Sequence, residues 1–102
     1  MRLFEDMMEF VFEEANDSEK YAKLAIKLKA DHPDLAKMFG DLSDNEHKHM
    51  KLMCEHLTKM AAAHEQYHIP DEMVSAWNYV KGTMLNEQSM RIKHLHGMYS
   101  GS

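Results

Sequence analysis

Two long stretches of the sequence repeat mainly apolar residues at alternating steps of three and four, the spacing that places side chains on one face of a helix. In residues 3–30 the repeating positions are Phe4, Met7, Val11, Glu14, Ser18, Tyr21, Ala25 and Leu28. In residues 33–66 they are Leu35, Phe39, Leu42, Glu46, His49, Met53, His56, Met60 and Ala63. This pattern is typical of helices that pack nearly antiparallel along a shared seam. We therefore expect an all-α fold built on a long helical hairpin.

Few residues interrupt these helices, because the chain has only two prolines and four glycines. The breaks fall at ADHP (residues 30–33), at QYHIPD (66–71) and in the tail HGMYSGS (96–102). Each proline stands where a helix would begin, the position at which proline is best tolerated. The predicted helices cover about residues 3–30, 33–66 and 71–97.

The third predicted helix carries two competing stripes. One consists of Met73, Trp77, Val80, Met84, Glu87 and Arg91, and the other of Leu85, Ile92, Leu95 and Tyr99. Because the second stripe is offset from the first, the sequence leaves the inner face of this helix open.

The composition describes one small acidic domain. The chain has 102 residues, of which 44% are hydrophobic and 28% charged, and we expect residues 1–102 to fold together. A net charge of −5 argues against nucleic-acid binding, and the dispersal of the positive residues among acids argues against an anionic membrane surface. No apolar run is long enough to span a membrane, and the acids in MRLFEDMMEF argue against a signal peptide. The single cysteine, Cys54, excludes an internal disulfide and fits a reducing, cytoplasmic location.

Ionisable residues occupy the predicted seam near the middle of the hairpin. Glu46, His49 and His56 lie in the stretch DNEHKHMKLMCEH (44–56), and burying such groups is costly unless something compensates. If the ADHP turn closes a hairpin, residues whose numbers sum to 63 lie side by side, which sets Glu14 opposite His49. Glu46 lies one helical turn from that level, so three ionisable residues should meet at one height.

Two explanations for this cluster are open. A metal site would neutralise the carboxylates, whereas a polar network without metal could set the register of the helices at a high desolvation cost. The Glu46-x-x-His49 spacing alone is weak evidence, because Glu65-x-x-His68 repeats it away from the seam. His56 could be an additional metal ligand or a hydrogen-bonded histidine of the core.

At these residues the sequence resembles the ferritin-like di-iron carboxylate superfamily, and in particular its short rubrerythrin-like members and encapsulated ferritins. The stretches FEEANDSEKYAKLA (12–25) and LSDNEHKHMKLM (42–53) carry the resemblance, which extends over about residues 5–60. It implies that Glu14, Glu46 and His49 bind iron. It also implies a catalytic role for Tyr21, whose phenol would tune the metals or donate an electron, and the alternative is that Tyr21 is a plain aromatic residue of the core.

A single chain has too few ligands for the complete site of that superfamily. The site takes one Glu from each of two helices and Glu-x-x-His from each of the other two. This chain offers one such set, and its third helix has Glu87-x-x-Met90 instead. We therefore expect a homodimer, or a higher homo-oligomer, whose two-fold interface closes a four-helix bundle around the metals. Housing in a protein shell is an alternative assembly, and the role of the third helix with Glu87 and His94 is left open.

By resemblance, the expected activity is that of a ferroxidase-type oxidoreductase in which Fe(II) is oxidised by O₂ or peroxide. The oxygen-rich ligand set suits iron, and manganese is an alternative. A peroxide-reducing rubrerythrin-like enzyme or a manganese-catalase-like enzyme could use the same scaffold. A reductase would need an external electron donor, since the sequence lacks rubredoxin-like cysteine pairs. A non-enzymatic helical dimerisation module is the remaining alternative.

Overall fold

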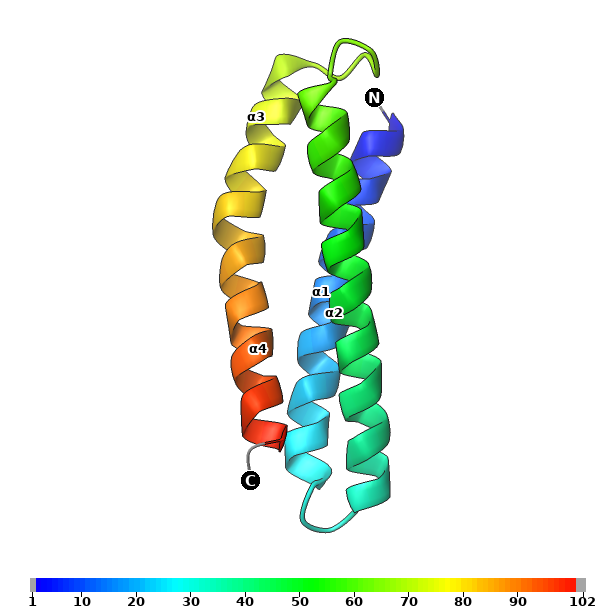
Figure 1. The fold of residues 1–102 in the computed structure, drawn as a ribbon, viewed down its shortest axis with the longest axis vertical. Helices are drawn as coiled ribbons and strands as arrows, with labels where there is room; N and C mark the ends of the chain where they lie inside the picture. Colours follow the sequence, from blue (N-terminus) through cyan, green and yellow to red (C-terminus); the bar gives the residue numbers. More distant parts are fainter. Residues whose placement is uncertain (1, 101–102) are drawn as a thin grey trace.

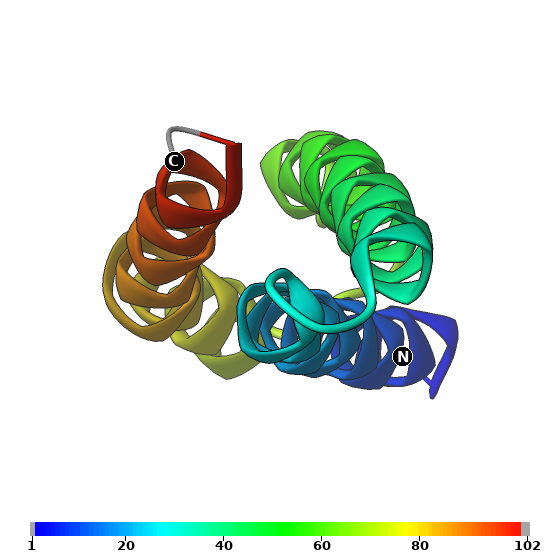
Figure 2. The same ribbon diagram turned by 90° about the horizontal axis from the view of Figure 1, so that it is seen from below.

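The computed structural model describes residues 2–100, and within this range the protein consists of helices joined by two short connections, with no strand (Figure 1). The helices are α1 (Arg2–Leu28), α2 (Pro33–Ala62), α3 (Asp71–Val80), the π-helical turn η1 (Lys81–Leu85) and α4 (Asn86–Ser100). Because α3, η1 and α4 follow one another without a break, they form one rod, which we call the arm. Seen along the bundle, α1, α2 and the arm stand at the corners of a triangle (Figure 2). The predicted all-α fold with a long hairpin is confirmed.

The first turn forms as the sequence predicts. Pro33 is the first residue of α2, and His32 precedes it as the N-cap, although its side chain makes no capping hydrogen bond. The amide of His32 donates to the carbonyl of Leu28 at 2.8 Å, which closes the turn between the two helices.

The second predicted boundary is wrong by four residues, because α2 ends at Ala62 rather than at residue 66. Residues 63–68 form turns, and His68 has a φ of 56°, in the left-handed region where a helix cannot continue. Beyond it, Ile69 is buried in the same apolar cluster as Trp77 of the arm. The chain leaves the helix early because this buried position fastens the connection to the arm. Among residues 2–100, no helix is apolar enough over a sufficient length to cross a bilayer.

The apolar core lies at the end of the bundle where α3 packs. Its largest members are Trp77, Phe4 and Leu57, which are fully buried, and Phe4 meets Trp77 edge to face with ring centres 6.4 Å apart. Toward the other end of the bundle many buried residues are small, and they include Ser18 and Ser43, while Ile92 of α4 is a large buried exception. Apolar burial therefore holds the top of the arm, and Ile92 together with polar contacts holds its lower part.

The π-turn resolves the two competing stripes of the third predicted helix. A π-turn adds one residue to a helix and so shifts the face that follows it. Trp77 is buried before the turn, Leu85 is buried as its last residue, and Gln88 and Ile92 are buried after it. The two stripes are thus successive parts of one inner face, which η1 keeps directed at the hairpin.

The predicted seam of α2 is wrong for four of its nine positions, which are exposed, and of the nine only Met60 is buried. Its exposed members are Leu35, Leu42, His49 and His56. The buried residues of α2 are instead Ala36, Ser43, His47, Met50, Leu57, Met60 and Ala61. The physical reason is the arm, which packs against the hairpin from one side and draws the buried face of each helix toward itself. The expected stripe runs along the opposite edge of the hairpin, which we call the open edge.

Replacing Trp77 with alanine tests the role of the apolar core. We expect Trp77→Ala to lower the free energy of unfolding by about 3–5 kcal/mol, since it leaves a large cavity. Urea denaturation followed by circular dichroism measures this change. Tyr79→Ala is the matched control, because Tyr79 is 68% exposed on the same helix and its loss should cost less than about 1 kcal/mol. Equal losses for the two variants would contradict this assignment of the core.

Candidate metal centre

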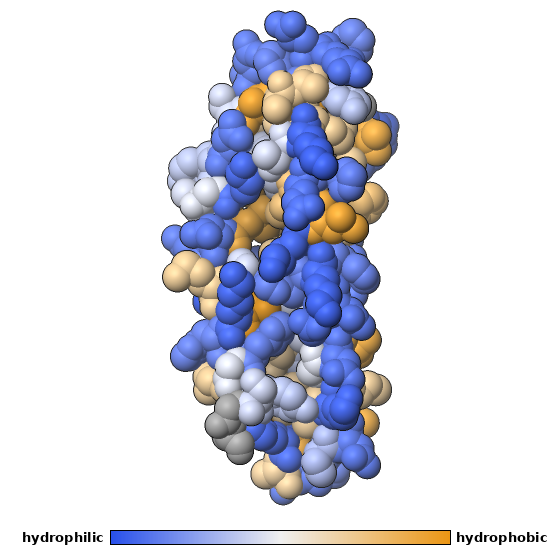
Figure 3. Space-filling model, viewed as in Figure 1, coloured by the Kyte–Doolittle hydropathy of each residue, from blue (hydrophilic) through white to orange (hydrophobic). Residues whose placement is uncertain are grey.

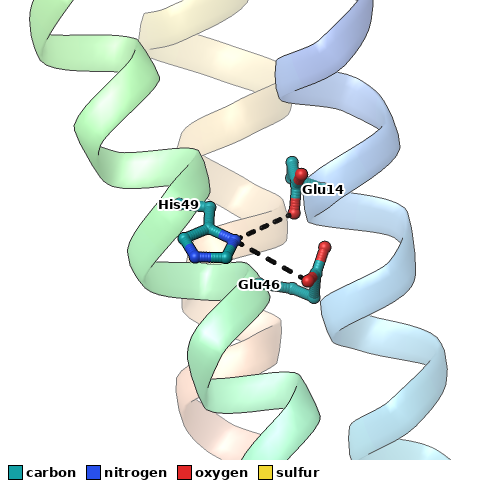
Figure 4. A group of neighbouring side chains, drawn as sticks. All are labelled: Glu14, Glu46 and His49. Carbon is teal, nitrogen blue, oxygen red and sulfur yellow. Dashed lines mark ion pairs between the residues drawn. The ribbon is translucent and has the colours of Figure 1, made fainter.

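Glu14 of α1 and Glu46 and His49 of α2 converge at the middle of the hairpin (Figure 4). One ligand atom from each of the three lies within 4.8 Å of the others. His49 Nδ1 is 3.7 Å from Glu14 Oε2 and also 3.7 Å from Glu46 Oε1. These separations are too long for hydrogen bonds, but they leave room for an ion between the three side chains.

Helix geometry brings the three residues together. Glu46 and His49 are three positions apart and therefore project from the same face of α2. Glu14 reaches the same level from α1 because the short turn at residues 29–32 fixes the register of the two helices. The pairing of Glu14 with His49, derived from the turn alone, is confirmed.

Glu14 is the least compensated polar group of the cluster. Its Oε2 atom is buried and accepts no hydrogen bond from the described residues. The pKa of Glu14 is raised from 4.5 to about 7, mainly by burial and then by the neighbouring Glu46 carboxylate, while His49 acts in the opposite direction. At neutral pH the two carboxylates therefore repel each other, and a divalent cation between them would remove that cost.

A polar network on the inner side of α2 holds this helix, which carries Glu46 and His49, in place. His47 Nε2 lies 2.9 Å from Ser89 Oγ of α4, and His96 Nε2 lies 2.7 Å from Ser43 Oγ. Since the Ser43 hydroxyl donates to the carbonyl of Ser18 at 2.6 Å, His96 must be the donor to Ser43. Burial is the main cause of the lowered pKa of His47, and the positive charge of Lys51 lowers that pKa further. The ring therefore stays neutral.

The sequence predicts only part of this network. His47 lies next to Glu46 in the sequence, and the structure places it against the arm. The contribution of His96 and Ser89 was missed, because nothing in the local pattern of α4 signals a partner on α2. Ser18 was a visible hint, since it is a small polar residue in an otherwise apolar stripe.

A family model described as rubrerythrin matches residues 8–96, which is most of the chain. The chain belongs to the rubrerythrin family. This family is part of the ferritin-like di-iron superfamily, so the resemblance stated from the sequence is confirmed. The chain has no significant match among curated proteins or among solved structures.

Domains of the rubrerythrin family typically bind iron, and the donor set of this chain fits that metal. Two carboxylates and one imidazole favour iron or manganese, whereas structural zinc sites favour thiolates. The uncompensated Oε2 of Glu14 is an independent sign that the site suits a cation. Glu14, Glu46 and His49 are the residues that would hold it.

Two further residues predicted for the site lie outside this cluster. Tyr21 stacks on Phe39 with ring centres 5.9 Å apart, about 10.5 Å along the helix axis from Glu14. His56 is exposed and stands about 10.5 Å from His49 along α2. Their roles, as a catalytic phenol and as an extra ligand, remain predictions. Glu87 and His94 are exposed on the arm, and neither joins the cluster.

The raised pKa of Glu14 predicts how stability depends on pH in the rubrerythrin-family chain without metal. The pKa of Glu14 in the folded chain exceeds its value in the unfolded chain. The stabilising contribution of the protonated carboxyl is therefore complete below about pH 4.5 and is lost as the pH rises through about 7. We expect Glu14 to contribute a fall of roughly 1–3 kcal/mol in the free energy of unfolding between pH 5 and pH 8.

Urea denaturation across this pH range measures the effect, with the variant Glu14→Gln and the neighbouring control Glu13→Gln. Glu14→Gln should flatten the pH dependence, whereas Glu13→Gln, at an exposed position, should leave it as in the parent chain. The same pH dependence in Glu14→Gln as in the parent chain would contradict the electrostatic description of the cluster.

Proposed function

We propose that the protein binds a pair of iron ions at a site shared by two copies of the chain and oxidises Fe(II) there. The observation that carries the proposal is the cluster of Glu14, Glu46 and His49 at the open edge of the hairpin. The buried, uncompensated oxygen of Glu14 favours a cation over a purely structural polar network.

The number of ligands supports a shared site. Three donors from one chain satisfy half of the arrangement of two Glu and two Glu-x-x-His motifs. His49 retains 56% of its side-chain exposure, so a second copy could approach the cluster from the open edge. A two-fold axis at this point would duplicate all three residues and close a four-helix bundle.

The surface around the cluster also favours a second copy as the covering partner. Large hydrophobic residues stay exposed on the hairpin, namely Leu3, Phe10, Leu35, Met38, Leu42 and Leu52. On α2, Leu35, Leu42 and His49 recur every seven residues, the repeat of helices that pack side by side. Hydrophobic side chains also line the edge of α2 that faces away from the arm (Figure 3).

The residues of this chain have distinct chemical tasks in the proposed reaction. Bound iron would supply one-electron chemistry toward O₂ or peroxide. Glu46 and Glu14 supply negative charge, and Glu14 must release its proton when a cation binds, because its pKa is about 7. The Nδ1 atom of His49 completes the donor set. Binding should therefore strengthen as pH rises through 7.

The oxidant and the metal that support activity would distinguish the other activities possible on the same scaffold. Peroxide reduction is the alternative most compatible with membership of the rubrerythrin family. Cys54 does not supply an electron-transfer thiolate, since burial raises its pKa to about 11. Faster oxidation of bound Fe(II) by peroxide than by O₂ would favour that alternative, and activity with manganese alone would favour a catalase.

Alanine variants of the ligands test the proposed activity. Glu46→Ala and His49→Ala should each abolish stoichiometric metal binding and Fe(II)-dependent oxygen consumption, because each removes a donor from both halves of the shared site. Metal analysis and an oxygen electrode measure these losses. Glu87→Ala is the control, since Glu87 is exposed on the arm. A parent protein that stays free of metal under Fe(II), with no oxygen consumption, would leave only the non-enzymatic dimerisation module.

Charge placed on the open edge tests the shared interface. Leu42→Glu should weaken dimerisation by roughly a hundredfold or more, since a two-fold interface loses two apolar side chains and gains two repelling charges. Light scattering after size-exclusion chromatography measures the mass of the assembly. Tyr79→Glu places the same charge on the outer face of the arm and should leave the dimer intact. A parent chain that binds metal as a monomer would exclude the shared site.

A further inference from the structure

A groove of about 530 Å³ runs between α1 and α4. Its lining consists of Asn16, Glu19, Lys20, Lys23, Leu24 and Lys27 of α1 with Gln88 and Arg91 of α4. It lies on the far side of α1 from the metal cluster, because the nine residues from Glu14 to Lys23 turn the helix by about 900°, or half a turn beyond two full turns. The groove is therefore separate from the candidate metal centre.

The groove concentrates positive charge in an acidic protein. Four of the 12 Lys and Arg residues of the chain line it, together with one acid, so its lining carries a formal charge of +3. Since the whole chain carries −5, the remaining residues carry −8. In the sequence Lys20, Lys23 and Lys27 lie close together on α1, and the fold brings Arg91 of α4 to them.

Glu19 organises the cations but neutralises only part of their charge. Its carboxylate, which is 15% exposed, lies 3.2 Å from Lys23 Nζ and 3.3 Å from Arg91 Nη2. Both separations exceed the roughly 2.7–2.9 Å of a strong charge-assisted hydrogen bond. Arg91 contacts Glu19 through Nε and Nη2, so its Nη1 hydrogens can point toward a ligand. Lys20 and Lys27 add two exposed ammonium groups along the same wall.

The donors in the groove match a ligand that only accepts hydrogen bonds. The Gln88 amide donates to Asn16 Oδ1 at 2.8 Å, which leaves the NH₂ group of Asn16 as a further donor. An acidic peptide would bring backbone amides that need acceptors, and the helices on both sides use their own carbonyls internally. A phosphate chain brings acceptor oxygens alone, and guanidinium with ammonium groups suits phosphate well.

The length of the groove favours a chain of phosphates over a single one. Lys20 and Lys27 are seven residues apart on α1, about 10.5 Å along the axis. We propose that this groove binds a linear oligophosphate, either free inorganic polyphosphate or the phosphate tail of a nucleotide. The adjoining groove of about 370 Å³, with Met90, His94 and Leu95 in its wall, lies next to Arg91 and would take the organic end of a nucleotide.

Titration of the ¹⁵N-labelled protein with inorganic triphosphate, without added metal and in 0.1 M salt, tests the proposal. We expect saturable shifts confined to residues 16–27 and 88–95, with a submillimolar Kd that weakens as salt increases. Orthophosphate should bind at least tenfold more weakly. A parallel titration with ATP distinguishes the two kinds of phosphate ligand. Tighter binding of ATP, with shifts at Met90 and Leu95, indicates a nucleotide, and equal affinity indicates the phosphate chain alone.

Matched charge variants separate a built site from general attraction. The double variant Lys20→Gln/Lys27→Gln should lose at least tenfold in affinity for triphosphate. The control Lys37→Gln/Lys48→Gln removes the same charge from α2, where both lysines are about 70% exposed, and should lose less than twofold. Equal losses in the two variants, or shifts that do not saturate by 1 mM triphosphate, would overturn the proposal. Since none of these lysines belongs to the candidate metal centre, the outcome is independent of Fe(II) oxidation.

Discussion

The register of α1 against α2 is the constraint on which the rest of the structure depends. Ser18 and Ser43 lock it with reciprocal hydrogen bonds, in which each hydroxyl donates to the main-chain carbonyl of the other residue. This register places Glu14 level with His49. A slip of one helical turn would displace the two by about 5.4 Å and separate the donors that could hold a single ion.

The arm divides the hairpin into two unlike sides. On one side Trp77 and Leu85 pack into the apolar core, and His47 and His96 bond to serines on neighbouring helices. On the other side the carboxylates, an exposed imidazole and several large hydrophobic residues lie at the open edge. A protein rarely leaves such a combination uncovered, because apolar surface and repelling carboxylates are both costly in isolation. A second copy and a pair of cations would relieve both costs together.

The same packing that forms the core also redistributes charge. Placing α4 beside α1 joins Arg91 to three lysines and leaves Glu19 as the single carboxylate among them. The resulting groove and the candidate metal centre use opposite faces of α1 and attract ligands of opposite charge. One helix thus has a cationic side and an anionic side, a separation that the net charge of the chain conceals.

The sequence alone determined the helical hairpin, its first turn and the meeting of Glu14, Glu46 and His49, because helix periodicity and a short turn are local properties that fix heights. Only the tertiary structure decided which way the hairpin faces, since burial depends on where the arm packs. It showed that the ligand stripe lies at the open edge, that η1 joins two offset stripes into one face, and that α2 ends early to bury Ile69. His96 and Arg91 acquire their roles in the same way, from contacts between residues more than fifty positions apart that no local pattern records.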